Sequence, residues 1–184
     1  MRILPFVLAL PLAQAAPAPT APAAREIAPD TYVLPGAMLP NRGPDGNTVV
    51  LFRRSDVVSA GDLLDLTNFP VIDLKSGGNV QGMIAALNHL IDTTVPEAHA
   101  AGGTMVIPGH GRLADHAEVA YYRDMLTIMR DRVEDLTKKR QTLDQIKAAH
   151  PAREYEPRYG HTTGAWTTDM FVEATYRSLM QGTN

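Results

Sequence analysis

The clearest folding pattern in the sequence begins with two short apolar runs, which the turn residues Arg53–Asp56 separate. Thr48–Phe52 and Val57–Ala60 predict a pair of buried strands, because apolar β-branched runs bounded by turn residues are typical of strands. A helical pattern over Asn79–Asp92 follows, then a further strand over Thr104–Ile107, and then more helical patterns. Strands followed by helices in this order indicate a layered α/β domain.

Capping residues set the predicted helix boundaries in the second half of the chain. Asp115 is a predicted N-cap, with Glu118 three residues later as its reciprocal cap. Thr142 opens a second capping box and a short helix that Pro151 ends. A last amphipathic helix is predicted over residues 168–180.

The N-terminus predicts export to the periplasm or out of the cell. Residues 1–15 combine a positive charge, an apolar run and a small-x-small cleavage pattern, which is typical of a signal peptide, with a retained anchor as the alternative. No apolar run is long enough to span a bilayer, so stable membrane insertion is not expected. Residues 16–26 predict a Pro/Ala-rich linker, and residues 27–184 a single incomplete domain that begins with a short strand over Thr31–Leu34.

Composition limits the chemistry available to this chain. The sequence has 17 Lys and Arg against 20 Asp and Glu, and a net charge of −3 gives no global electrostatic reason to bind nucleic acid. The absence of cysteine excludes disulfides, thiolate zinc sites and a cysteine nucleophile. Any bound metal ion must therefore be held by His, Asp or Glu.

Two chemically capable side chains follow predicted strands. Asp62 comes directly after the strand Val57–Ala60 and one glycine, and His110 stands between two glycines after the strand Thr104–Ile107. Active sites of layered α/β folds usually lie in such strand-end loops, and carboxylate and imidazole both suit zinc. The simpler interpretation is a turn and a loop without chemistry, since such short motifs are weak signals by themselves.

Several separated segments share one further pattern, in the order Val57–Asp62, Phe69–Asp73, Ser76–Asn79 and Val106–Gly111. Together they resemble the C-terminal half of the metallo-β-lactamase fold family of hydrolases, and Trp166–Phe171 is similar to the end of its secreted members. The resemblance implies a partial αββα sandwich. It also implies a zinc-dependent hydrolase that uses metal-activated water on a small ester- or amide-type substrate.

The resemblance assigns metal-binding roles to particular residues. In this family the Asp of the Gly-Asp segment bridges two zinc ions, and the His of the Gly-His-Gly segment binds the second ion. Carried over, Asp62 is a bridging ligand and His110 a ligand of the second ion, with one or two zinc ions as the cofactor. Because catalytic zinc has about three protein ligands, Asp115, His116 and His161 are additional candidates. Their simpler roles are a helix cap and its neighbour, and a solvated loop histidine.

One part of the family pattern is absent. The family's main metal motif, H-x-H-x-D-H, does not occur in this chain, and no two of its histidines are one residue apart. The histidines are His89, His99, His110, His116, His150 and His161. The segment Asn41–Asn47, where a further family histidine is expected, contains none. We interpret this as an internal deletion that joined an early strand to a late one. The shortened sheet then lacks cover, so self-association is expected.

Three functions remain open at this point. The first is a zinc-dependent hydrolase, and the second is a catalytically inactive remnant or binding module of the same fold. The third is a helix-rich interaction protein whose contact surface is residues 115–140, motivated by the charge run from Arg130 to Arg140. Such runs are usually solvated helix faces. Bound zinc that depends on Asp62 and His110 would favour the first function over the other two.

Overall fold

The computed structural model describes residues 25–34, 48–96 and 103–181. In these residues five strands form one sheet, in the order in which they follow along the chain. The strands are β1 (Arg25–Ala28), β2 (Thr31–Leu34), β3 (Val49–Phe52), β4 (Val57–Asp65) and β5 (Met105–His110). The helices are α1 (Val80–Thr93), α2 (His116–Lys138), α3 (Leu143–Ala148), α4 (Glu156–Tyr159) and α5 (Thr168–Gln181), with a 3₁₀ turn at Leu74–Ser76. The predicted mixed α/β class is confirmed.

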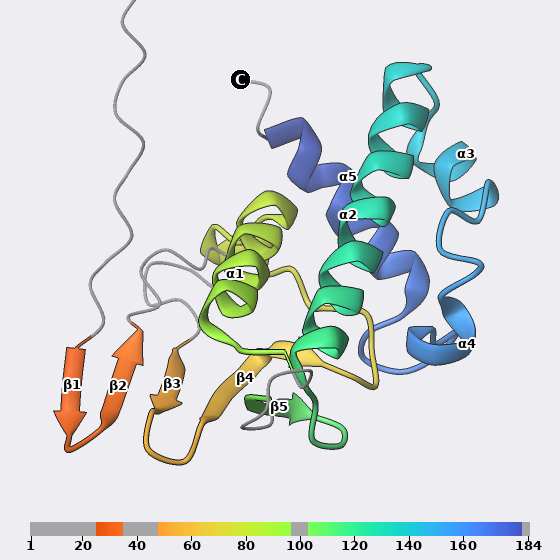
Figure 1. The fold of residues 1–184 in the computed structure, drawn as a ribbon. Coiled ribbons are helices and arrows are strands. Elements are labelled where there is room, and N and C mark those ends of the chain that lie inside the picture. Colours follow the sequence, from red (N-terminus) through yellow and green to blue (C-terminus); the bar gives the residue numbers. More distant parts are fainter. Residues whose placement is uncertain (1–24, 35–47, 97–102, 182–184) are drawn as a thin grey trace, which may run out of the picture.

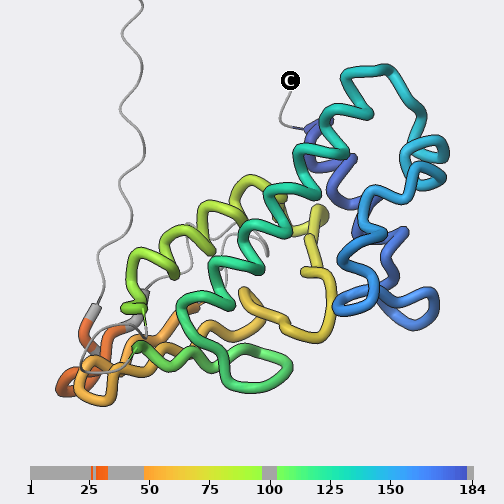
Figure 2. Tube along the Cα trace, turned by 45° about the vertical axis from the view of Figure 1, so that its right-hand side comes forward, coloured from red at the N-terminus to blue at the C-terminus, as the bar shows by residue number. Residues whose placement is uncertain are grey.

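Pairing in the sheet changes direction at its last strand. Strands β1 to β4 are antiparallel neighbours, whereas β5 lies parallel to β4 after the crossover through α1. Strand β1 begins at Arg25, slightly before the expected start of the folded part at residue 27. Figure 1 shows α1 and α2 above the sheet, on one of its two faces, and Figure 2 shows the same arrangement from a second direction.

Strands β4 and β5 are longer than their sequence pattern indicates. The prediction that β4 ends before Asp62 is wrong, because the strand continues to Asp65. The register shifts at Gly61, whose φ is +53°, and pairing then resumes between Asp65 and His110. A bulge of this kind adds a residue and bends a strand without ending it.

The core lies between the sheet and the helices. Val58 and Val106 pair across β4 and β5 and are fully buried beneath α1 and α2. Helix α1 was expected to present one apolar face, and its buried residues are Val80, Met83, Ile84, Ala86, Leu87 and Leu90. Farther out, Phe69 stacks on Phe171 of α5 with ring centroids 4.6 Å apart. This contact fixes the segment after β4 against the C-terminal helix.

Local capping agrees with the sequence pattern at the starts of α2 and α3. The Asp115 carboxylate accepts a hydrogen bond from the Glu118 backbone N–H at 2.8 Å, so the predicted N-cap of α2 is confirmed. The Glu118 carboxylate instead accepts hydrogen bonds from Arg112 and Arg158. The capping box that begins at Thr142 is present in full. In α2 the ion pairs Lys138–Glu134 and Lys139–Asp135 fit the solvated helix face expected there.

Several predictions lie outside the described residues. They are the signal peptide over 1–15, most of the linker over 16–26, the junction at Asn41–Asn47, and His99. Within the described ranges, none of the helices combines the length and apolar character that crossing a membrane requires.

The Phe69–Phe171 contact predicts a strong dependence of stability on Phe69. Phe69→Ala removes a ring that is only 1% exposed, so we expect a loss of about 3–5 kcal/mol in unfolding free energy, measured by urea denaturation. Phe52→Ala is the matched control, because the same change at a 38% exposed ring is expected to cost about 1 kcal/mol or less. Equal losses in the two variants would contradict this account of the core.

A second stability prediction concerns Glu173, which links α5 to α3. Its carboxylate accepts hydrogen bonds from Lys147 at 2.7 Å and Arg177 at 2.8 Å, and these bonds lower the pKa of Glu173, that from Lys147 the most. A lowered folded-state pKa stabilises the protein above the unfolded value of about 4.3, and this stabilisation is lost as pH falls through the folded value.

Thermal unfolding between pH 7 and pH 3 tests this link between the helices. Glu173→Gln should lower the melting temperature at pH 7 and flatten the decline on the acid side. The control Glu134→Gln removes a carboxylate that pairs within a single exposed helix turn and should have a smaller effect. An unchanged acid limb in Glu173→Gln would argue against the assignment.

Candidate functional site

Parallel pairing of β4 and β5 brings Asp62 and His110 together. His110 Nε2 lies 3.8 Å from Asp62 Oδ1, and the two side chains are 63% and 47% exposed. Both therefore reach solvent at the carboxyl-terminal part of adjacent parallel strands, where functional sites of α/β folds usually lie. The two strand-end residues that the sequence singled out therefore lie next to each other, and their metal-binding role stays a prediction.

Close backbone approach at Gly109 makes this juxtaposition possible. A Cβ atom at Gly109 would lie 2.6 Å from Asp62 Oδ1 and 2.8 Å from the carbonyl carbon of Gly61. Real Cβ atoms do not approach other atoms so closely, so a side chain here would displace Asp62 or separate the strands. Glycine thus serves a packing role at this position, beyond permitting a turn.

The donor atoms of this pair suit a zinc ion in type and fall short in number. Imidazole nitrogen and carboxylate oxygen are common zinc ligands, and catalytic zinc usually has three protein ligands. In the part of the chain that the structure describes, no three His, Asp or Glu side chains are grouped so that they could hold a metal ion. Asp62 and His110 alone do not complete a catalytic zinc site.

Asp115 and His116 have local roles at the start of α2. The Asp115 carboxylate caps the helix, as described above. His116 Nδ1 lies 2.8 Å from the hydroxyl of Thr94, which also contacts the Ile91 carbonyl oxygen at 3.1 Å. These contacts connect α2 to the end of α1. The structure therefore does not group either residue with Asp62 and His110, and their metal-binding role remains a prediction.

His161 lies beside the segment that follows β4. Its Nε2 is 3.4 Å from the Thr67 carbonyl oxygen. The neighbouring Leu66 N–H donates to the His110 carbonyl oxygen at 3.0 Å, so the same short segment contacts both histidines. No local pattern predicts this, because the two histidines are 51 residues apart in the sequence and each contacts the backbone of a third segment.

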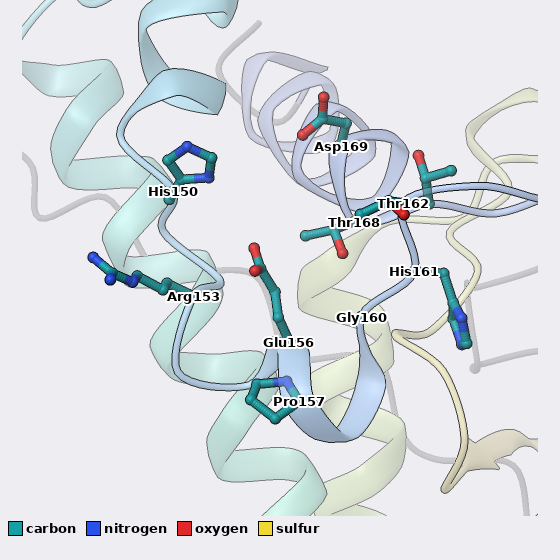
Figure 3. Close-up of a pocket in the computed structure, with 10 residues that line it drawn as sticks. His150, Arg153, Glu156, Pro157, Gly160, His161, Thr162, Thr168 and Asp169 are labelled. Atoms are coloured by element: carbon teal, nitrogen blue, oxygen red, sulfur yellow. The ribbon is translucent and has the colours of Figure 1, made fainter.

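A pocket of about 590 Å³, with His161 among its lining residues, opens between α4 and the start of α5. Its lining residues are His150, Arg153, Glu156, Pro157, Gly160, His161, Thr162, Thr167, Thr168 and Asp169. Figure 3 shows the Glu156 carboxylate among the labelled side chains, while the His161 ring points away from most of them. The lining carries both signs of charge. Sequence reasoning missed this pocket, because its lining residues, all between positions 150 and 169, form no recognisable motif.

Asp65 is a further residue that sequence reasoning missed, and it organises the loop next to the Asp62–His110 pair. Its carboxylate accepts hydrogen bonds from the backbone N–H groups of Thr67 and Asn68 at 2.8 and 3.0 Å. The Tyr122 hydroxyl of α2 donates to the Asn68 carbonyl oxygen at 3.3 Å. Burial, with the nearby Asp65 charge, raises the pKa of Tyr122 well above its usual value, so Tyr122 remains a neutral donor.

Comparison with solved structures relates this fold to the metallo-β-lactamase fold. A double mutant of the sec-alkyl sulfatase PisA1 matches with a TM-score of 0.54 and 12% identity, covering 82% of this chain and 24% of that one. VMB-1 matches with a TM-score of 0.42 and 19% identity, covering 56% and 44%. The metallo-β-lactamase DIM-1 matches with a TM-score of 0.41 and 16% identity, covering 56% and 45%.

The match to the alkyl sulfatase structure shows a fold and not an activity. The chain has part of the metallo-β-lactamase fold, as the resemblance implied. It spans less than half the length of each of the three solved structures. A scan of protein-family models finds no match, and a search of curated protein sequences finds none either.

The close approach at Gly109 predicts that Gly109→Ala destabilises the sheet. The added methyl group must displace Asp62 or part β4 from β5, so we expect a loss of about 1–3 kcal/mol in unfolding free energy, measured by urea denaturation. Gly77→Ala is the control, since its Cβ meets no atom within 4 Å and only its positive φ of +85° opposes the change. A Gly109→Ala variant as stable as the wild type would contradict the close packing.

Proposed function

We propose that this protein is a zinc-dependent hydrolase of the metallo-β-lactamase fold, acting on a small ester- or amide-type substrate in the periplasm or outside the cell. The observation that carries the proposal is the 3.8 Å approach of His110 Nε2 and Asp62 Oδ1 on adjacent parallel strands. Both side chains are exposed, so a metal ion and a substrate have access to them. The partial fold supports the same class.

In such a site Asp62 would contribute a negative charge and His110 a nitrogen donor. The carboxylate supplies negative charge that offsets a divalent cation, and the imidazole supplies a nitrogen donor. When bound, zinc lowers the pKa of a water ligand to about 7 and so provides a nucleophile at neutral pH. The bulge at Gly61 and the close approach at Gly109 hold the two side chains next to each other.

The small number of candidate metal ligands favours a second, non-catalytic function. Because the described residues bring together only two candidate ligands, a catalytically inactive remnant or binding module of the same fold is the alternative. Such a protein would keep the architecture and have neither stoichiometric zinc nor hydrolysis. The two functions differ in metal content, which can be measured without knowing the substrate.

Zinc content of the purified chain is the test of the proposal. We expect about one zinc ion per chain by elemental analysis after dialysis, and its loss in His110→Ala, because that change removes one of two adjacent donors. His89→Ala is the matched control, since His89 is an exposed histidine on α1 and should leave the zinc content unchanged. Circular dichroism of each variant establishes that the fold is retained.

Hydrolysis of a chromogenic ester and a chromogenic amide then separates the two functions. Zinc-dependent turnover that is lost in His110→Ala and retained in His89→Ala supports the hydrolase. A wild-type chain without zinc, or with zinc that survives His110→Ala, overturns the proposed site. Zinc at Asp62 and His110 without turnover of either compound supports the non-catalytic alternative.

A further inference from the structure

Backbone contacts, more than side-chain packing, set the position of His110. Its side chain is 63% exposed, so packing restrains the ring only weakly. The turn that carries it is closed at its base by two hydrogen bonds between the backbones of Val106 and Ala114, at 2.8 and 2.9 Å. Within this turn the His110 carbonyl oxygen accepts a hydrogen bond from the Leu66 N–H at 3.0 Å. The place of the imidazole therefore depends on where Leu66 lies.

Leu66 lies in a loop that one carboxylate organises. Asp65 Oδ1 accepts hydrogen bonds from the Thr67 N–H at 2.8 Å, the Asn68 N–H at 3.0 Å and the Thr67 hydroxyl at 2.7 Å. Asp65 Oδ2 accepts a fourth hydrogen bond, from the side-chain amide of Asn68 at 3.1 Å. A carboxylate that accepts from backbone N–H groups two and three residues later fixes the local turn. Asp65 thus holds the backbone that presents the Leu66 N–H.

Two further contacts hold this loop against the rest of the molecule. The hydroxyl of Tyr122, a fully buried residue of α2, donates to the Asn68 carbonyl oxygen at 3.3 Å. A Cβ atom at Gly111 would lie 2.9 Å from Leu66 Cβ, so the loop packs directly against the backbone that follows His110. Because protein interiors are closely packed, a shift of the loop would move the backbone around His110 or open a gap there.

We propose that Asp65 is the positioning residue of the Asp62–His110 pair, and that its hydrogen bonds set the affinity of this pair for zinc. The carboxylate acts through the loop and the Leu66 N–H, and thereby holds His110 Nε2 3.8 Å from Asp62 Oδ1. Removing a residue that orients a metal ligand typically weakens metal binding by about 10- to 100-fold. The effect on zinc affinity rests on the proposed function, whereas the effect on the position of the ring does not.

NMR of histidine-labelled protein in the presence of EDTA tests the positioning without metal. At one fixed pH, Asp65→Ala should shift the ring signal of His110 and leave that of His89 unchanged, because the loop bonds to His110 while His89 lies on helix α1. Asp73→Ala is the matched control. The Asp73 carboxylate also accepts from backbone N–H groups two and three residues later, in a different turn. This control should leave both ring signals unchanged.

Competition with a chelator measures zinc affinity in the same variants. We expect the dissociation constant for zinc to rise about 10- to 100-fold in Asp65→Ala and to stay at the wild-type value in Asp73→Ala. Asp65→Asn should retain most of the affinity, because its amide oxygen can accept the same hydrogen bonds from the Thr67 and Asn68 N–H groups. Thr67→Val removes one of the four hydrogen bonds and keeps the shape of the side chain, so it should give an intermediate loss.

The two readouts separate a failure of the positioning role from a failure of the proposed function. A wild-type chain that binds no zinc overturns the proposed function and the affinity change together, while the NMR signal still decides the positioning. An unchanged His110 signal in Asp65→Ala overturns the positioning role, whatever the zinc content.

The conservative variant adds a second decisive comparison. An Asp65→Asn variant that loses as much zinc affinity as Asp65→Ala also overturns the proposal, because the charge of Asp65 and not its hydrogen bonds would then act. Circular dichroism should show that each variant is folded. Thr67→Val keeps the test decisive if Asp65→Ala does not fold, since it must then shift the His110 signal by itself.

Discussion

Parallel pairing between β4 and β5 is the constraint on which the candidate site depends. Two features allow it: the register shift at Gly61, and the lack of a side chain at Gly109, where a Cβ would lie 2.6 Å from Asp62 Oδ1. Pairing resumes at Asp65 and His110, so the strands stay together past the bulge. A carboxylate and an imidazole that are far apart in the sequence thereby come within 3.8 Å. The hydrogen bonds of Asp65 then fix the loop that follows.

The chemistry open to this site depends on how many donors meet there. One carboxylate and one imidazole can begin a zinc site, but they leave more open positions than a catalytic zinc usually has. The remaining sequence candidates are held elsewhere, since Asp115 caps α2 and His116 contacts Thr94. His161 contacts the Thr67 carbonyl oxygen, and the adjacent Leu66 bonds to His110, yet within the described residues His161 belongs to no group of three metal donors. The donor count, and not the fold, separates the hydrolase from the non-catalytic alternative.

Local sequence rules predicted the elements well and their continuation less well. Apolar runs located β3, β4 and β5, and the capping residues Asp115 and Thr142 located helix starts, because both signals act over a few residues. The extension of β4 to Asp65 was not predicted, since Gly61 looks like a strand end unless the partner strand is known. Placement of His161 beside Thr67 depends on packing between distant segments, which no local pattern encodes.

The uncovered sheet face and the small number of metal donors both occur in a chain that has only part of a fold. The chain has part of the metallo-β-lactamase fold, and α1 and α2 lie on one face of its sheet while no described helix lies on the other (Figure 1). The uncovered face and the missing metal donor nevertheless differ in what would complete them. An apolar face needs only cover of sufficient area and matching shape. A zinc site needs a third donor at a defined position. Ile107 is exposed on β5 and His110 ends the same strand, so the apolar face and the donor pair can be changed by separate substitutions.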